Sequence, residues 1–293
     1  MGDIHRVTAN DVEFAYLEAG PDDGPLALCL HGFPDSAHTW RHLLPELADA
    51  GYHAVAPFQR GYAPTAIPAD GAYQTGALAT DAVALHQAFG GRDDAVVLGH
   101  DWGAAAAFGA ATLEPGRWRR VVTLALPPLG AMMTRFFDYD QLKRSFYVFL
   151  FQTQLAEHAL DRDLVAALWA DWSPGHDAAQ DVEYAWECLA EPQHRAAALG
   201  YYRARLDASL HQERYADAQA ATNKAGGTPV LYLHGADDGC IGAEVAEPGL
   251  VMKHLPPGSR AEIVPDAGHF LHLENPSDVN ARVLEWLRVE PPA

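Results

Sequence analysis

The sequence predicts an α/β fold, in which helices flank a mostly parallel central sheet and a helical cap is inserted between two parts of the core. Two observations lead to this prediction. Short apolar runs, which suit strands buried on both faces, alternate with helical patterns over most of the chain. One long segment, residues 129–216, breaks the alternation and contains no convincing buried strand.

The predicted strands are short and apolar, as in a sheet that is covered on both faces. They comprise residues 26–30, 53–57, 95–98, 121–126, 230–233 and 261–264. Helical patterns occupy residues 76–89, the segment that follows Trp102, and residues 277–287. Strands that alternate with helices in this way form parallel sheets with helices on both faces.

The segment 129–216 is rich in helix-forming residues and in Tyr, Trp and Phe. It begins after Pro127-Pro128, and a polar, glycine-containing stretch follows it. We therefore predict a core made of two separate parts, residues 1–128 and 217–293. The residues between them form a helical cap that we expect over the carboxyl edge of the sheet.

The composition limits the partners that are expected. The chain has 293 residues with 20 Lys and Arg against 39 Asp and Glu, which gives a formal net charge of −19. Such acidity repels nucleic-acid phosphates and anionic lipid headgroups, so we expect neither nucleic-acid nor membrane-surface binding. Apolar residues make up 49% of the chain, which argues against disorder. No apolar run approaches the roughly 20 residues of a membrane span, and the oligomeric state has no signature in the sequence.

The N-terminus lacks the apolar segment of a signal peptide. The cysteines, Cys29, Cys188 and Cys240, are odd in number and widely spaced, so they form neither a disulfide framework nor a CxxC pair. We therefore expect a protein of the reducing cytoplasm. The histidines show no metal-ligand spacing and no glycine-rich phosphate loop is present, so no metal or cofactor is predicted.

The most informative stretch is Gly99-His100-Asp101-Trp102-Gly103, which lies between a predicted strand and a predicted helix. A sharp strand-to-helix turn needs small residues on either side of its centre, because larger side chains would collide there. Such a turn is the nucleophile elbow, which holds the central side chain clear of the backbone. The sequence therefore predicts Asp101 as a nucleophile; the alternative is an aspartate that only caps the helix.

An aspartate nucleophile changes the reaction that is expected. Its carboxylate is already ionised at neutral pH, unlike serine, which needs a base before it attacks a carbonyl. A carboxylate suits attack on an sp³ carbon with a leaving group, and the product is an alkyl ester of Asp101, which water must then hydrolyse. Asp101 therefore favours epoxide opening or dehalogenation over hydrolysis of an ordinary ester.

Hydrolysis of that ester needs an acid and a base, which follow the nucleophile along the chain in that order. Asp237 and Asp238 both follow the predicted strand 230–233, and we favour Asp238. His269 lies in a loop after the last predicted strand and fits the base, with His272 as its competitor. In this scheme His269 activates the water, while the aspartate orients the imidazole and offsets its developing charge.

These motifs together resemble those of the epoxide hydrolases of the α/β-hydrolase fold, over nearly the whole chain. The motifs that carry the resemblance are His31-Gly32-Phe33-Pro34, Gly99-His100-Asp101-Trp102-Gly103, Gly235 with Asp238, and Gly268-His269-Phe270. Arg60-Gly61-Tyr62 is similar to a family loop, although Gln59 and Ala63 depart from the usual residues. The resemblance implies that the main-chain amides of Phe33 and Trp102 form the oxyanion hole.

The resemblance also implies two cap tyrosines above the nucleophile, whose phenols assist ring opening by donating hydrogen bonds or a proton. Tyr147 precedes Phe151-Gln152 at the spacing of the family. Tyr202 directly precedes Arg203, as the second tyrosine does in the family, and Tyr201 is its rival.

The nucleophile and the resemblance together predict a cofactor-independent epoxide hydrolase. Its substrate is expected to be a small, mostly apolar epoxide, which water converts to a vicinal diol through the ester on Asp101. The first alternative is a haloalkane or haloacid dehalogenase with the same nucleophile. However, Phe33 has no side-chain donor for a halide, and no arginine follows Asp101 to bind a haloacid carboxylate. The second alternative is a catalytically silent binding protein on the same fold.

Overall fold

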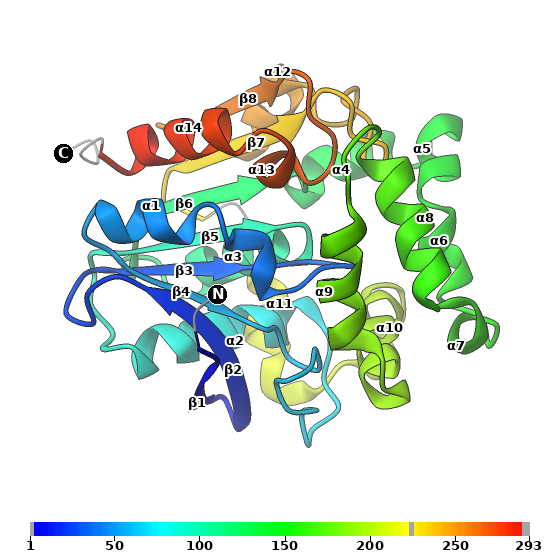
Figure 1. Cartoon of the computed structure of the whole chain (residues 1–293), viewed down its shortest axis with the longest axis horizontal. Coiled ribbons are helices and arrows are strands. Elements are labelled where there is room, and N and C mark those ends of the chain that lie inside the picture. The colour runs from blue at the N-terminus through cyan, green and yellow to red at the C-terminus, as the bar shows by residue number, and fades with distance from the viewer. Residues whose placement is uncertain (1–2, 223–225, 289–293) are drawn as a thin grey trace.

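Residues 3–222 and 226–288 are described by the computed structural model, in which a central sheet carries helices on both faces (Figure 1). The sheet has eight strands in the order β1-β2-β4-β3-β5-β6-β7-β8. Neighbours from β4 onward in this order are parallel, whereas β1 and β2 pair antiparallel. The predicted α/β fold class is confirmed.

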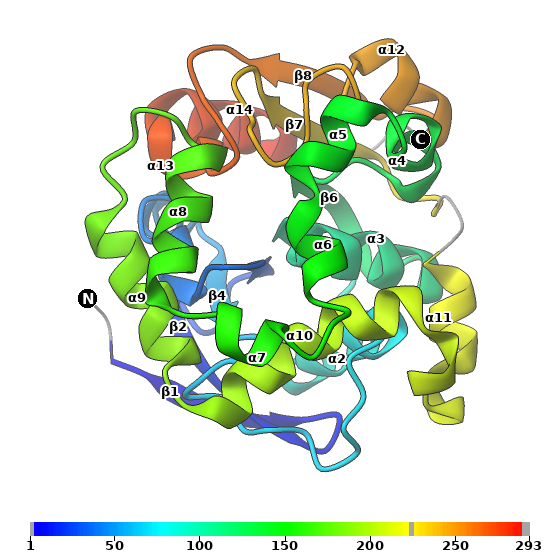
Figure 2. The same ribbon diagram turned by 90° about the vertical axis from the view of Figure 1, so that its right-hand side faces the viewer.

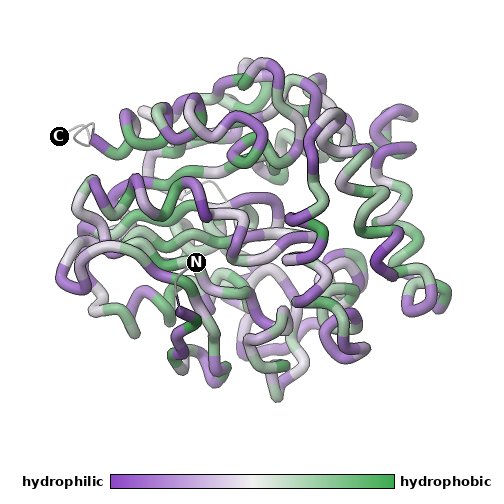
Figure 3. The backbone as a smooth tube through the Cα atoms, viewed as in Figure 1, coloured by the Kyte–Doolittle hydropathy of each residue, from purple (hydrophilic) through white to green (hydrophobic). Residues whose placement is uncertain are grey.

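Every predicted strand is present in the sheet. The parallel strands are β3 (Leu26–Leu30), β4 (His53–Pro57), β5 (Ala95–His100), β6 (Trp118–Leu124), β7 (Val230–Gly235) and β8 (Arg260–Val264). β3, β4, β5 and β7 are buried along their whole length, as expected for strands with helices on both faces. The centre of the sheet is accordingly hydrophobic (Figure 3).

Two further strands were not expected from the apolar runs. β1 (His5–Ala9) and β2 (Val12–Ala19) form an antiparallel hairpin at one edge of the sheet. β1 is mostly exposed and β2 alternates between buried and exposed residues in its first part, so neither shows a continuous apolar run. Asn10 and Asp11 form the turn with φ values of 45° and 60°, a conformation that these residue types adopt readily in hairpins.

The remaining helices of the core cover the two faces of the sheet. They are η1 (Ala37–Trp40), α1 (Leu44–Asp49), α2 (Thr75–Ala88), α3 (Trp102–Leu113), α12 (Pro248–Val251), η4 (Met252–His254), α13 (Leu271–Glu274) and α14 (Pro276–Arg288). α2 and α3 pack together on one face, and α1 and α14 lie on the other (Figure 1). No helix in residues 3–222 or 226–288 is both long enough and apolar enough to span a bilayer.

Between β6 and β7 the chain is helical and contains no strand in residues 129–216. Its helices are α4 (Leu129–Arg135), α5 (Tyr139–Arg144), α6 (Phe146–Leu150), α7 (Ala156–Ala159), α8 (Arg162–Trp172), α9 (Ala179–Leu189), α10 (Pro192–Leu206), η2 (Ala208–Leu210), η3 (Glu213–Tyr215) and α11 (Ala216–Ala221). Figure 2 shows α6, α8 and α10 in front of the strands, viewed toward the carboxyl edge of the sheet. The cap boundaries at residues 128 and 216 stay a prediction. The last helix of this region, α11, packs on α2 and α3 of the core.

Candidate active site

Asp101 stands at a sharp turn between β5 and α3. Its backbone has φ 51° and ψ −118°, a conformation that is rare for a residue other than glycine. A Cβ on Gly99 would overlap the main chain of Gly103, and a Cβ on Gly103 would overlap the carbonyl of Leu30. The glycines are therefore required by close packing, as in a nucleophile elbow. The Asp101 side chain accepts no hydrogen bond from the second or third residue of α3, as a helix-capping aspartate would.

Two main-chain amides contact the Asp101 carboxylate. The N–H of Phe33 donates a hydrogen bond to Oδ1 at 2.9 Å, and the N–H of Trp102 is a second donor to the carboxylate. The residue before Phe33 must be glycine, because a Cβ on Gly32 would overlap the Asp101 side chain. Burial raises the pKa of Asp101, while the charge of His269 and the two amide hydrogen bonds oppose that rise.

His31 holds the loop that carries Phe33. Its Nδ1–H donates to the Gly32 carbonyl at 2.9 Å, so Nε2 accepts a hydrogen bond from the main-chain N–H of Gln59, also at 2.9 Å. Burial lowers the pKa of His31 to about 4, so the ring is neutral at physiological pH and keeps this arrangement. The loop after β3 is thereby attached to the segment after β4.

His269 and Asp238 form a buried pair on the loops that follow β8 and β7. Nδ1–H of His269 donates to Oδ2 of Asp238 at 3.0 Å. The other carboxylate oxygen, Oδ1, accepts from the main-chain N–H groups of Cys240 and Ile241 at 2.7 and 2.8 Å. The neighbouring Asp237 is exposed, so of the two aspartates it is Asp238 that pairs with His269.

This pair determines which nitrogen of the neutral His269 ring carries the proton, and it raises the pKa of the ring. Because Nδ1 carries the proton, Nε2 of His269 has a free lone pair, and it makes no hydrogen bond within the described residues. Burial lowers the pKa of His269, but the charge and hydrogen bond of Asp238 outweigh burial, so the pKa lies above its ordinary value. Burial likewise raises the pKa of Asp238, but the charges of His269 and His234 and its hydrogen bonds bring it below its ordinary value.

Trp172, at the end of α8, ties both of these loops to the cap. Its carbonyl oxygen accepts from the main-chain N–H of His269 at 2.9 Å and from that of Gly239 at 3.1 Å. Its indole ring packs 5.1 Å from the imidazole of His269 and 5.0 Å from the ring of Tyr147. The relative position of His269 and Asp238 therefore depends on Trp172.

The two predicted cap tyrosines lie side by side, with ring centroids 5.6 Å apart. The hydroxyl of Tyr147 is 3.4 Å from Sγ of Cys240, and the buried hydroxyl of Tyr202 has no hydrogen-bond partner in the described part of the chain. Tyr201, the rival of Tyr202, donates its hydroxyl to the Arg60 carbonyl at 2.8 Å. Burial raises the pKa of Tyr147 and of Tyr202 well above 10, so both phenols stay protonated.

Asp101, Trp102, Tyr147 and Tyr202 all line one cavity of about 660 Å³. This volume is within the range of small-molecule sites. The structure thus brings the predicted nucleophile together with both predicted phenols. Phe33 also packs edge-on against Tyr202, with ring centroids 5.3 Å apart.

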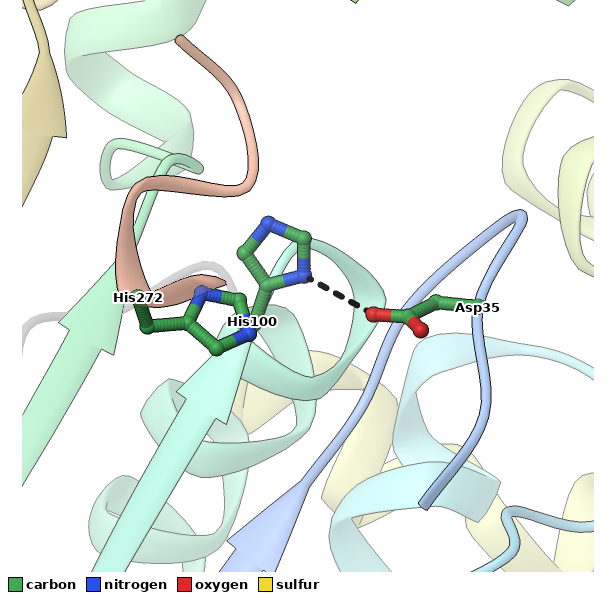
Figure 4. Close-up of side chains that lie close together, drawn as sticks. All are labelled: Asp35, His100 and His272. Carbon is green, nitrogen blue, oxygen red and sulfur yellow. Dashed lines mark ion pairs between the residues drawn. The ribbon is translucent and has the colours of Figure 1, made fainter. Parts of the chain in front are cut away.

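His272, the competitor for the base, lies in a second buried cluster with His100 and Asp35 (Figure 4). Its Nε2 is 2.6 Å from the hydroxyl of Thr39, and burial lowers its pKa to about 3. Among the described residues, no hydrogen bond or ion pair joins His272 to a carboxylate, unlike His269. One atom of each of Asp35, His100 and His272 lies within 4.8 Å of the others, and these residue types do bind transition metals.

The hydrogen bonds of this cluster indicate which nitrogen of His100 carries the proton. Nε2–H of His100 donates to the carbonyl of His269 at 3.0 Å, so Nδ1 of His100 is an acceptor. That Nδ1 faces Oδ2 of Asp35 at 3.8 Å, and neither atom has a hydrogen-bond partner among the described residues. Burial raises the pKa of Asp35 to about 8, so its carboxyl group is protonated at neutral pH and directed at an acceptor.

Two contacts of the site were not anticipated. Cys240, which the sequence marked only as an isolated cysteine, donates its main-chain N–H to Asp238 and places its thiol beside Tyr147. The sequence did contain a signal for the first contact, because Cys240 follows Asp238 by two residues. An aspartate side chain commonly accepts a hydrogen bond from the main-chain N–H two residues later in a turn. The sequence contains no comparable signal for Trp172, because its contacts with His269 and Gly239 are made by its main-chain carbonyl, which any residue has.

Comparison with known proteins places these observations in a family context. A family model described as the alpha/beta hydrolase fold matches residues 25–276. Epoxide hydrolase A of Mycobacterium tuberculosis is 30% identical over 96% of each chain, and the AB hydrolase superfamily protein YfhM of Bacillus subtilis is 29% identical over 96% of each. The crystal structure of Epoxide Hydrolase A from Mycobacterium thermoresistibile superposes with a TM-score of 0.78 at 28% identity, over 100% of both chains.

Proposed function

The chain belongs to the alpha/beta hydrolase fold family, and on that premise we propose that it is an epoxide hydrolase with Asp101 as its nucleophile. One observation carries the proposal: a carboxylate on a nucleophile elbow and two buried, protonated phenols line the same cavity. A serine hydrolase needs no phenols, whereas an epoxide oxygen that leaves as an alkoxide needs a donor.

The first step forms an ester and opens the ring. Oδ2 of Asp101, the oxygen that is not bonded to the Phe33 amide, attacks an epoxide carbon and displaces the ring oxygen. The hydroxyls of Tyr147 and Tyr202 donate to that oxygen, and one of them supplies its proton. Their raised pKa values keep them protonated until the alkoxide, which is far more basic, develops.

The second step hydrolyses the ester. Nε2 of His269 takes a proton from water, and the hydroxide attacks the carboxyl carbon of Asp101. Oδ1 then carries the negative charge, which the Phe33 and Trp102 amides stabilise; one such donor is worth about 3 kcal/mol in related sites. Collapse releases Oδ2 with the diol, and Oδ2 takes the proton that the added hydroxide retained. The water oxygen stays in the Asp101 carboxylate, while the proton on His269 returns to the phenolate.

A dehalogenase with the same nucleophile has less support from the site. A halide leaves as an anion that needs hydrogen-bond donors but no proton, and Phe33 offers only its ring toward Tyr202. A silent binding protein would have no use for the free Nε2 of His269 beside a hydrogen-bonded Asp238.

The test is a panel of aryl, alkyl and trans-disubstituted epoxides beside haloalkanes, with diol and halide both measured. Diol formation without halide release is expected. Halide release without diol would indicate a dehalogenase. If neither product forms, the protein is a catalytically silent binding protein. A single turnover in ¹⁸O-labelled water adds a mechanistic readout, because the label should enter Asp101 and not the diol.

A further inference from the structure

The loop that carries His269 is bound along its main chain by residues of both the cap and the core. The N–H groups of residues 268, 269 and 270 all donate hydrogen bonds. Their acceptors, in the same order, are Oε2 of Glu274 at 2.8 Å, the carbonyl of Trp172 at 2.9 Å and Oγ of Ser173 at 3.1 Å. Trp172 ends α8 of the cap and Ser173 follows it, whereas Glu274 ends α13 of the core.

Glu274 and Ser173 also bind each other. The buried hydroxyl of Ser173 donates to Oε1 of Glu274 at 2.6 Å, so each oxygen of this carboxylate has one donor. Because the proton of the Ser173 hydroxyl is used on Glu274, the oxygen of that hydroxyl is left to accept from the N–H of Phe270. The two side chains therefore form one unit that binds the residue before His269 and the residue after it.

Close packing leaves the loop little room to move against α8. A Cβ on Gly268 would overlap the Trp172 carbonyl, and a Cβ on Gly239, which follows Asp238, would overlap the carbonyl of Asp171. The absence of a side chain lets the main chains approach each other at both places. The exact placement of the loop matters, because a displacement of about 1 Å at an active site can lower the rate about 100-fold.

The Glu274 carboxylate also acts on His269 through its charge. Burial lowers the pKa of His269, and the charges of Asp238, Asp101 and Glu274 raise it. The donors to Glu274 are neutral, and no ion pair offsets its charge among the described residues. The other titratable groups near the ring are uncharged at neutral pH, because burial lowers the pKa of the imidazoles and raises that of the thiol; they are His100, His234, His272 and Cys240.

We propose that Glu274 and Ser173 are positioning residues, which hold His269 where its Nε2 activates water and so serve the second step of the reaction but not the first. The proposal rests on the proposed epoxide hydrolase function, in which Asp101 attacks without a base. Side chains that only stabilised the fold would support both steps equally. The rates of the two steps therefore distinguish positioning from a purely structural role.

The first test is Glu274→Ala, which removes two hydrogen bonds and the charge. Decay of the ester should slow about tenfold, the effect of one hydrogen bond to a charged group, while alkylation of Asp101 keeps its rate. Single turnovers of styrene oxide, followed by intact-mass analysis, should show the ester accumulating. Glu247→Ala is the matched control, because this exposed glutamate at the start of α12 also accepts two main-chain hydrogen bonds. Neither step should change in the control.

The second test is Glu274→Gln, which removes the charge and keeps the shape. The side-chain oxygen can still accept from the Gly268 N–H, and the NH₂ group can donate to the oxygen of Ser173. The rate of ester decay at high pH should therefore be retained. Its midpoint should move to lower pH, because the lost charge is one that raises the pKa of His269. Thermal unfolding shows whether each variant is folded.

A measurement without substrate separates this proposal from the proposed function. The pKa of His269, followed by NMR of the imidazole and assigned by its absence from His269→Gln, should be lower in Glu274→Gln than in the native protein. Diol formation in which folded Glu274→Ala slows both steps equally, or neither, would overturn the positioning role and leave the epoxide hydrolase intact. A lowered pKa of His269 in Glu274→Gln without any ester or diol would uphold the action of Glu274 on His269 and overturn the enzyme.

Discussion

The main-chain N–H of Phe33 donates a 2.9 Å hydrogen bond to Oδ1 of Asp101. In the proposed mechanism this oxygen becomes the ester carbonyl and then the oxyanion. The donor is therefore in place when charge develops, and a preorganised donor needs no rearrangement at that moment. Gly32 makes this contact possible, because a Cβ there would overlap the Asp101 side chain.

Gly32→Ala should consequently impair the reaction. The added methyl group must displace either the loop or the nucleophile, so we expect turnover to fall by about 100-fold or more. Diol formation and thermal unfolding would be measured together, since this site is buried. Gly227→Ala is the control, because a Cβ at Gly227 meets no atom within 4 Å. A folded Gly32→Ala variant with full activity would contradict the assigned oxyanion hole.

His269→Gln should trap the ester. Alkylation of Asp101 needs no base, whereas hydrolysis needs the free Nε2 of His269. Intact-mass analysis after addition of styrene oxide should show the protein heavier by the mass of one epoxide. Adding Asp101→Ala to this variant should abolish the adduct. A folded His269→Gln protein that gains no mass would count against the two-step mechanism.

Tyr147→Phe and Tyr202→Phe should slow alkylation more than ester hydrolysis. Each change removes one donor to the leaving alkoxide, and we expect a loss of about 10- to 100-fold in the first step, which one remaining phenol still supports. Stopped-flow tryptophan fluorescence in single turnovers would resolve the two steps. Tyr201→Phe is the matched control, since its hydroxyl bonds the Arg60 carbonyl. Equal slowing of both steps would mean that the phenols are structural.

The parallel sheet was predictable because its strands are apolar runs. Each run indicates a buried strand by itself, without knowledge of the strand that pairs with it. β3 and β5 are buried throughout, and burial on both faces leaves a continuous apolar signature. The β1–β2 hairpin lacks that signature, since an edge strand exposes part of its surface to water. Its information lies in Asn10-Asp11, a turn signal that is weak without a recognised strand on each side.

Some features of the site are likewise encoded in short local motifs, whereas others depend on residues far apart in the sequence. The elbow around Asp101 is specified by adjacent glycines, so a short motif was enough to find it. The choice of Asp238 over Asp237 depends on which side chain of one turn faces His269, and the sequence leaves it open. The contact of Tyr147 with Cys240 joins residues 93 positions apart, so it is recognised only in the folded chain.

Hydrolysis of the ester should depend on pH through His269. The imidazole must be unprotonated to accept a proton, and Asp238 outweighs the effect of burial and holds its pKa above 6.5. The rate of ester decay should therefore rise with pH through a midpoint above 6.5. Asp238→Asn should move the midpoint to lower pH and slow decay by about 10³-fold or more, because the Nδ1–H tautomer is lost.

Single-turnover decay at a series of pH values would check this dependence, with Asp237→Asn as the control on an exposed neighbour. If the midpoint is the same in Asp238→Asn as in the native protein, a group other than Asp238 raises the pKa of His269.

Asp35 should make the stability of the protein depend on pH in the direction opposite to that of a paired carboxylate. Burial is the main cause that raises its pKa from 3.8 to about 8, with Asp181 adding to the rise. The hydrogen bonds from Thr39 and Ser36 and the charge of Arg41 oppose it. The folded state thus keeps this proton in a pH range where the unfolded chain releases it.

Below pH 3.8 the carboxyl group of Asp35 is protonated in both the folded and the unfolded state, so it does not lower the free energy of unfolding. Between 3.8 and about 8 the unfolded chain ionises first, so the free energy of unfolding falls as pH rises. Asp35→Asn removes the titration and keeps a neutral group of similar shape. Its unfolding free energy relative to the native protein should therefore increase from pH 4 to pH 8, with a slope of up to about 1.4 kcal/mol per pH unit.

Urea denaturation of both proteins across this pH range would measure the difference, and other carboxylates cancel in the comparison. Asp49→Asn, which changes an exposed aspartate, should show no such trend. If Asp35→Asn is instead less stable than the native protein by the same amount at every pH from 4 to 8, Asp35 is ionised in the folded state too, because a carboxylate with a lowered pKa contributes its full stability throughout this range. The same experiment thereby decides whether Asp35 is protonated beneath the loop of His269.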